Sequence, residues 1–171
     1  MEQEQSFDIG GKFSFELVRD GKVIDQWEEK NLVVNQGLNH LLNVQLGATA
    51  KVATWYVGLF EGNYTPTSEV TSATIKATAT ECVAYTEATR PEWVDAPAAS
   101  QQITNSANKA TFTINAAKTI YGAFLTSANA KDGTGDAAGV LFAATRFATS
   151  RAVIADDQLL VTYTVQASNP A

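Results

Sequence analysis

The feature that most constrains the fold is a two-residue alternation near the C-terminus. From Gln158 to Gln166, every second residue is apolar; these residues are Leu159, Val161, Tyr163 and Val165. Because successive side chains of a strand point to opposite faces, this pattern predicts a strand with one buried face. The same reasoning predicts four further strands, over residues 54–60, 109–116, 120–127 and 139–147.

An early hairpin is predicted around a turn at Gly21. A two-residue loop would set Glu16 directly opposite Asp25, which opposes two like charges. A three-residue loop with Gly21 in the left-handed conformation shifts the register by one residue and pairs Phe13 with Trp27. We expect the second register, because it gathers the apolar side chains on one face.

One helix is expected, with Asn35 as its cap and Gly47 as its left-handed end. Its apolar stripe consists of Leu38, Leu41, Leu42 and Leu46. Residues 72–80 fit either a short helix or a strand. About eight strands at this spacing, with one short helix in the N-terminal half, predict an all-β sandwich or jelly roll.

The domain organisation follows from polarity and length. Residues 1–11 are polar and end in two glycines, so we expect an arm that is either frayed or bound to a neighbour. Residues 12–171 are expected to form a single β domain, since a chain of this size buries roughly 70% of its unfolded surface.

Composition excludes several classes of protein. The net charge is -6 and the twelve Lys and Arg residues are scattered, which argues against nucleic-acid binding and against an anionic membrane surface. A disulfide framework is excluded because Cys82 is the only cysteine. The N-terminal residues lack the pattern of a signal peptide, and no apolar stretch reaches the ~20 residues of a membrane span. We therefore expect synthesis in the cytoplasm.

The candidates for chemistry are few, and we expect no enzyme, cofactor or metal site. Classical nucleophile–histidine arrangements would all need His40, the only histidine, and no Gly-x-Ser-x-Gly elbow occurs. Asp132 and Asp136 have the wrong spacing for a calcium loop, so a hairpin turn is preferred. Cys82 is interpreted as a small buried apolar residue.

Two stretches in each half of the chain carry a resemblance. They are 31–42 (NLVVNQGLNHLL) and 55–62 (WYVGLFEG) in the front half, and 89–93 (TRPEW) and 139–163 (from GVLFAATRF to DQLLVTY) in the back half. Together they resemble small virion proteins of tailed bacteriophages, of the capsid cement or decoration type. The resemblance implies a jelly-roll protein that binds the outer surface of the assembled head, at symmetry axes, and stabilises it against internal DNA pressure.

This resemblance implies further expectations. The partners would be the major capsid protein and other copies of the chain, in a dimer or trimer, and the location would be the virion. The alternative is a tail- or fibre-associated module that binds host carbohydrate through exposed aromatic residues. Such a platform could comprise Trp55, Tyr56, Tyr64, Tyr85 and Trp93.

The aromatic residues also suggest where an interface would lie. They fall in segments with few charges, and Trp and Tyr carry much of the binding energy in protein interfaces. Trp93, held extended between two prolines, is the first choice. The expected interface residues are Phe7, Ile9, Trp27, Arg90, Pro91 and Trp93.

Overall fold

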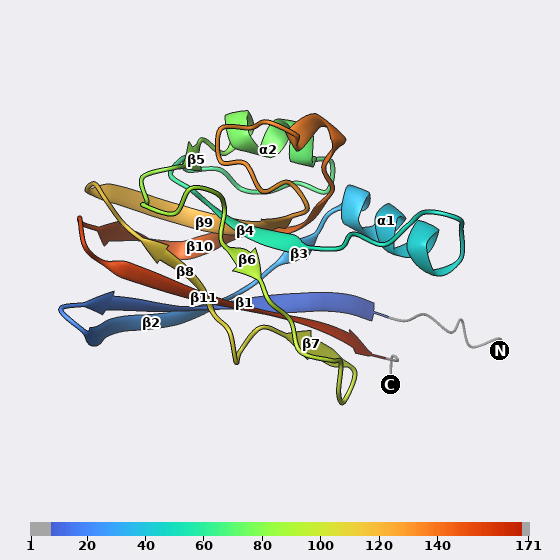
Figure 1. Cartoon of the computed structure of the whole chain (residues 1–171), viewed down its shortest axis with the longest axis horizontal. Helices are drawn as coiled ribbons and strands as arrows, with labels where there is room; N and C mark the ends of the chain where they lie inside the picture. The colour runs from blue at the N-terminus through green and yellow to red at the C-terminus, as the bar shows by residue number, and fades with distance from the viewer. Residues whose placement is uncertain (1–7, 169–171) are drawn as a thin grey trace.

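Two antiparallel sheets pack face to face in the computed structural model, which describes residues 8–168 (Figure 1). The five-stranded sheet contains β1 (Asp8–Arg19), β2 (Lys22–Lys30), β7 (Gln102–Thr104), β8 (Ala110–Thr113) and β11 (Gln158–Ser168). Its order is β2-β1-β11-β7, and β8 pairs with another part of β11. The all-β sandwich expected from the sequence is confirmed, whereas its jelly-roll topology stays a prediction.

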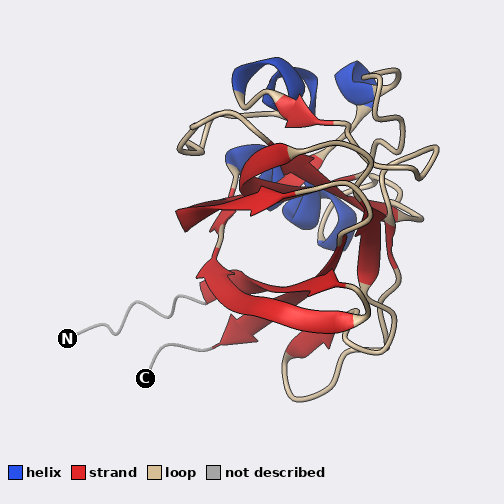
Figure 2. Cartoon of the chain, turned by 90° about the vertical axis from the view of Figure 1, so that its left-hand side faces the viewer, coloured by secondary structure: helices blue, strands red, loops and turns tan. Residues whose placement is uncertain are grey.

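The six-stranded sheet has the order β3-β10-β9-β4-β5, and β6 also pairs with β4. Its strands are β3 (Leu32–Val33), β4 (Trp55–Phe60), β5 (Glu81–Cys82), β6 (Glu92–Trp93), β9 (Lys118–Thr126) and β10 (Leu141–Val153). The helices of the described chain are α1 (Asn35–Gln45), α2 (Ser72–Thr78) and the short 3₁₀ helix η1 (Asp136–Ala138). None of them covers the outer face of the five-stranded sheet (Figure 2).

The main core lies between the sheets. The alternation in β11 is confirmed, because Leu159, Val161 and Tyr163 are fully buried there. Phe13 of β1 stacks on Tyr163, with ring centroids 4.2 Å apart. Apolar burial between two sheets is the dominant stabilising contribution in such a fold.

The six-stranded sheet is buried on its second face as well, where α2 and nearby loops pack. Two glycines make this packing possible. A Cβ on Gly58 would overlap the ring of Phe124, and a Cβ on Gly122 would overlap the ring of Phe60. Each aromatic ring thus lies over the glycine with which its own residue pairs in the neighbouring strand.

The hairpin of β1 and β2 turns differently from the expectation. Asp20 and Gly21 form a two-residue loop, and both have positive φ, 50° and 72°. Two residues with positive φ match the twist of a hairpin. Arg19 therefore pairs with Lys22, and the three-residue loop predicted from the sequence is wrong.

A β-bulge next to this turn then shifts the register by one residue. As a result Glu16 pairs with Gln26, so the charge opposition that made the two-residue loop unattractive does not occur. The predicted pairing of Phe13 with Trp27 is wrong. Trp27 pairs with Phe15 instead, and their rings stack at 5.0 Å.

Part of the predicted polar arm belongs to the sheet. β1 begins at Asp8, and the register from Asp8 opposite Ser168 to Gly11 opposite Val165 is continuous. Residues 8–11 of the predicted arm therefore belong to β1, because strand pairing satisfies the backbone groups of a segment without requiring apolar side chains. Phe7 lies outside the described residues.

The predicted helix is present as α1, but its ends differ from those expected. Val34 occupies the cap position, and the side chain of Asn35 donates to Glu69 at 2.6 Å. Leu46, not Gly47, closes the helix, in an αR conformation. The ambiguous segment at residues 72–80 contains α2, whose capping box joins Thr71 and Thr74.

Candidate functional site

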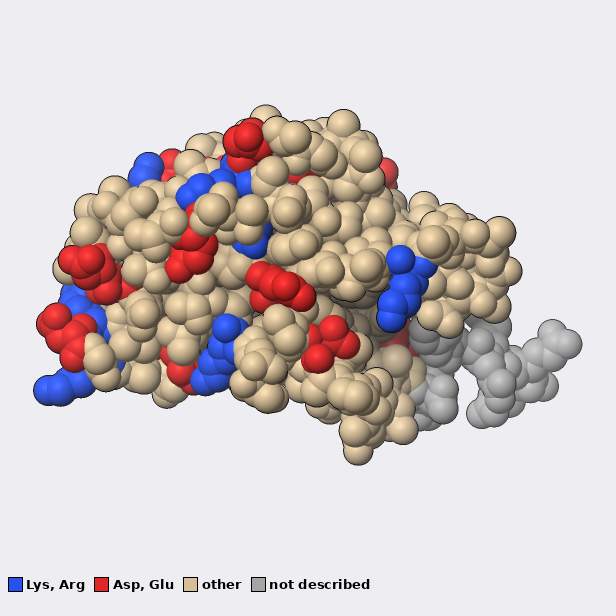
Figure 3. Space-filling model, viewed as in Figure 1, with Lys and Arg blue, Asp and Glu red and all other residues tan. Residues whose placement is uncertain are grey.

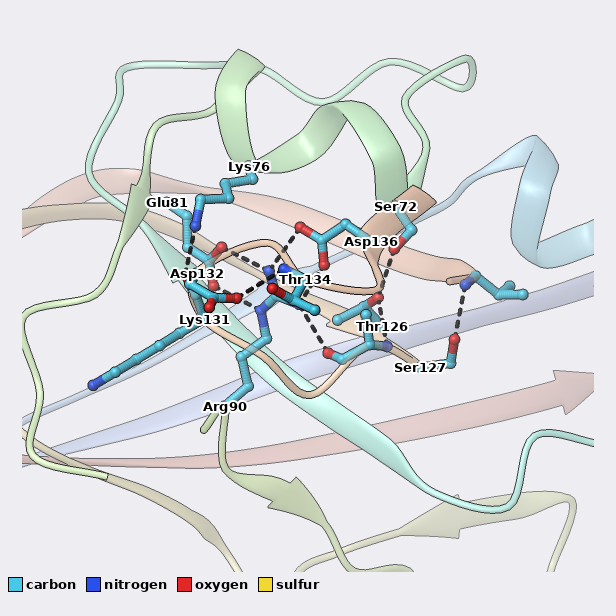
Figure 4. Close-up of polar contacts among 12 residues, drawn as sticks. Ser72, Lys76, Glu81, Arg90, Thr126, Ser127, Lys131, Asp132, Thr134 and Asp136 are labelled. Atoms are coloured by element: carbon cyan, nitrogen blue, oxygen red, sulfur yellow. Dashed lines mark hydrogen bonds and ion pairs between the residues drawn. The ribbon is translucent and has the colours of Figure 1, made fainter. Parts of the chain in front are cut away.

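A buried ionic cluster joins the loop after β9 to the start of β5 (Figure 4). The guanidinium of Arg90 binds both carboxylate oxygens of Glu81 at 2.7 Å and both of Asp136 at 2.8 and 3.2 Å. Its remaining N–H donates to the carbonyl of Ala128 at 2.8 Å. All five donors of the guanidinium are therefore satisfied, although its side chain is fully buried.

Burial and hydrogen bonding act in opposite directions in this cluster. Burial lowers the pKa of Arg90, but its hydrogen bonds to Glu81 and Asp136 outweigh burial and raise the pKa above the ordinary value. Burial raises the pKa of Glu81, and the hydrogen bonds from Arg90 oppose that shift. Because the guanidinium donors are bonded to both carboxylates, the cluster links three distant segments of the fold.

Further contacts hold the loop between β9 and β10 against its surroundings. Lys76 of α2 donates to the carbonyl of Lys131 at 2.6 Å. The ammonium of Lys131 in turn lies 4.3 Å from the ring centroid of Tyr85 and donates to its carbonyl. Asp132 accepts from the backbone of Thr134. The loop expected to be a simple hairpin turn is thus a folded element on the second face of the six-stranded sheet (Figure 4).

The first turn of α1 is also tied to the sandwich. The side chain of Gln36 accepts from the backbone of Ser72 at 2.9 Å and of Leu141 at 2.8 Å, and donates to the carbonyl of Gly139. A Cβ on Gly37 would overlap the backbone of Phe142, so the helix approaches β10 as closely as a glycine allows. These contacts fix the direction in which the rest of the helix projects.

Beyond this turn the helix is largely uncovered. We call residues 38–54, the remainder of α1 and the segment up to β4, the helix lobe; it projects from the end of the sandwich at the right of Figure 1. Leu42 is 48% exposed and Leu46 is 84% exposed. Half of the predicted apolar stripe therefore faces solvent instead of the core.

The outer face of the five-stranded sheet is a second uncovered surface. We call it the sheet face and define it by outward-pointing, half-buried residues at its centre: Ser14, Thr111, Thr113, Thr162 and Thr164. Two shallow grooves lie along it, one beside Thr164 and one beside Thr162. Lys12 on this face pairs with Glu28 at 2.9 Å.

The structure places most of the expected interface residues inside the domain. Trp93 is 5% exposed and donates from its indole to the carbonyl of Tyr163 at 2.9 Å. Trp27 is buried beside Phe147. Arg90 belongs to the buried ionic cluster. The interface prediction is therefore wrong for Trp93, Trp27 and Arg90, whose side chains pack inside the domain.

Pro91 and Ile9 remain half-buried. The carbonyl of Pro91 accepts from the backbone of Val57 at 2.9 Å, which ties the segment before β6 to β4. Ile9 packs against the main core from β1. The structure therefore does not bring the five described residues of this set together into one exposed patch, and the prediction for Phe7 lies outside residues 8–168.

The five aromatic residues considered for the alternative, a carbohydrate platform, do not form one exposed set either. Tyr85 and Trp93 are buried in the core. Trp55 is half-buried between His40 and Phe142. The ring centroids of Trp55 and His40 are 5.9 Å apart. Because two of the five aromatic residues are internal, they cannot stack on a sugar in this conformation.

The residues considered for catalysis are likewise separated. His40 packs edge-on against Trp55, and Cys82 is fully buried. Burial raises the pKa of the Cys82 thiol, which makes it a poor nucleophile. Within the described part of the chain, no three His, Cys, Asp or Glu side chains are grouped to hold a metal ion.

Two comparisons of the whole sequence accompany this geometry. No protein-family model matches the chain, and a search of curated proteins finds no match. Between residues 8 and 168, no helix has the length and apolar character needed to cross a membrane. The two uncovered surfaces, the sheet face and the helix lobe, are therefore the basis on which a function can be argued.

Proposed function

We propose that this chain is a cement protein of a tailed-phage head, which binds the outer surface of the assembled capsid through its sheet face. The uncovered sheet face carries the proposal: it is the broad flank of a rigid sandwich, and no helix covers it in residues 8–168. The phage assignment itself comes from the sequence resemblance. The partner would be the major capsid protein, and the location would be the outside of the virion, after synthesis in the host cytoplasm.

The chemistry of the sheet face suits contact with another folded protein. Hydroxyl groups such as those of Thr162 and Thr164 donate or accept hydrogen bonds with little rearrangement. Nearby charges are paired internally, for example Lys109 with Glu16 at 2.6 Å. Several charges on the face are therefore already neutralised within the chain, which lowers the cost of burying them against a partner.

The mechanism would be binding linkage and not catalysis. A protein that binds only the assembled shell stabilises it by RT ln(1 + [L]/Kd), about 2.7 kcal/mol per site at a hundredfold excess over Kd. The buried charged groups Arg90 and Asp157 are occupied in internal ion pairs, which agrees with a structural role for them.

A co-sedimentation assay with heads that lack the protein tests the proposal. Thr162→Arg places a bulky charge at the centre of the sheet face and should weaken binding by about tenfold or more, which is about 1.4 kcal/mol. Thr119→Arg, at an exposed threonine of the other sheet, serves as the matched control and should bind as the natural chain does. Failure of the natural chain to bind heads, or equal binding by Thr162→Arg, would refute the proposal.

A further inference from the structure

We propose that two copies of this chain associate through the helix lobe, with α1 of one copy packed against α1 of the other. This inference concerns the free protein and does not depend on whether the chain binds a capsid. Three properties of the lobe carry it: the scarcity of charge, a self-complementary surface pattern, and attachment of the first turn of α1 to the sandwich.

The helix lobe is almost free of charge. Between residues 31 and 60, Lys51 is the only Lys, Arg, Asp or Glu. The exposed side of α1 combines two leucines, Leu42 and Leu46, with amides and has no charged residue. A surface helix ordinarily presents charged residues to water. An exposed helix without charged residues and with two exposed leucines is closer in composition to the centre of an interface, where charged residues are depleted.

The pattern on the helix is complementary to itself. Leu42 and Leu46 are four residues apart and form an exposed ridge along the helix, in line with Leu38, whose side chain packs against the main core of its own chain. Ridges of this spacing interdigitate with the same ridges of a second helix, in the commonest class of helix packing. Asn39 and Asn43 form the adjacent exposed row, and an amide both donates and accepts, so symmetry-related amides can bond to each other.

The lobe is attached firmly enough to act as an interface. Gln36 joins α1 to α2 and β10 through three hydrogen bonds, and Gly37 sits directly on the backbone of Phe142. Little conformational freedom in the first turn then remains to be lost on association, which is one of the main costs of binding.

The distribution of charge favours a second copy of this chain as the partner of the helix lobe. Outside residues 31–60 the chain holds eleven basic and eighteen acidic side chains, so the sandwich body is acidic. Figure 3 shows these charges distributed over the sandwich, while the end of the molecule where α1 lies is mostly uncharged. A basic partner would be attracted to the body and not to the lobe.

Two acidic copies, in contrast, repel each other through their bodies. Contact between projecting lobes keeps the bodies apart: α1 has eleven residues and is therefore about 16 Å long, beyond the Debye length of about 8 Å at physiological salt. The lobe is thus the surface through which two copies of this chain meet with least repulsion.

Sedimentation velocity of the free, full-length chain tests this inference. The natural chain should shift from monomer to dimer as concentration rises. Leu42→Lys and Leu46→Lys should each weaken the dimer by about tenfold or more, because they place charge at the centre of the contact. Ile24→Lys is the matched control, since Ile24 is 49% exposed, as Leu42 is at 48%, but lies on β2.

Thermal melting of each variant separates a lost contact from a lost fold, and Leu46 is so exposed that its replacement should not disturb folding. A monomer at every concentration would overturn the inference. So would a dimer that Leu42→Lys and Leu46→Lys leave intact, or one that Ile24→Lys weakens equally. Head binding is measured separately, so failure here is distinguishable from failure of the cement proposal.

Discussion

Replacing Arg90 by alanine should destabilise the fold by about 3–5 kcal/mol. The reason is that Glu81 and Asp136 would keep their positions near or inside the core while losing their counter-ion. Both carboxylates bind the guanidinium through two oxygens, and the side chains of Arg90 and Glu81 are fully buried. The carbonyl of Ala128 would lose a donor as well.

The expected loss is large relative to the stability of a typical domain, which is about 5–15 kcal/mol. For a chain of this length, each kcal/mol lowers Tm by roughly 2–4 °C, so Arg90→Ala should lower Tm by about 6–20 °C. Urea unfolding followed by circular dichroism measures the free energy of unfolding. The slope of this free energy against urea concentration should be the same for Arg90→Ala as for the natural chain.

Two further variants serve as controls for Arg90→Ala. Arg146→Ala removes an arginine that binds only the side chain of Asn63, at an exposed position, and should cost less than about 1 kcal/mol. Arg90→Met combined with Glu81→Gln and Asp136→Asn removes all three charges and should be more stable than Arg90→Ala alone. A loss below about 1 kcal/mol for Arg90→Ala would refute the reasoning, because it would mean that the carboxylates find water or another partner.

Three further predictions concern other parts of the sandwich. Gly58→Ala should destabilise the chain by about 1–3 kcal/mol in urea unfolding, since the new methyl group must displace the ring of Phe124. The hydrogen bonds from Arg19 lower the pKa of Asp157, so its stabilising effect is present above the unfolded pKa near 3.9 and is lost as pH falls through the folded pKa. Asp157→Asn should therefore reduce Tm at pH 7 and make little difference near pH 2, and an equal effect at both would contradict this. The Cys82 thiol should react with iodoacetamide only when urea unfolds the chain, because burial raises its pKa and blocks access; rapid labelling of the native protein would show otherwise.

Side-chain periodicity predicted the strands well, because alternation is a local property. The apolar face of β11 follows from alternation, and the buried character of β4 follows from its continuous apolar run. The hairpin register could not be predicted, since the bulge beside the turn changes which residues face each other. A one-residue shift is decided by the packing of Trp27 on Phe15, which the sequence alone does not show.

The candidate site was harder to predict, because it depends on contacts between distant segments. Arg90 meets Glu81 and Asp136 across nine and forty-six residues, and no spacing rule signals such a cluster. The sequence predicts an extended segment around Trp93. It does not show that β6 covers the core beside Tyr163. A Trp in a charge-poor segment fits a core as well as an interface, and only tertiary packing distinguishes the two.

Helix α1 also shows what side-chain periodicity can and cannot predict. The leucine stripe of α1 was a sound reason to predict a helix, and the helix is present. The stripe did not predict burial, because the sandwich covers only one side of α1 and leaves Leu42 and Leu46 uncovered. Sequence periodicity indicates that an apolar face exists, whereas only the fold shows whether the same chain covers it.

Locating the chain in a density map of the intact virion tests the central claim most directly. The account predicts density for the sandwich on the outside of the head shell, with the sheet face around Thr162 and Thr164 toward the major capsid protein. Density in the tail, contact with the capsid through another surface, or absence of the chain from the particle would contradict it.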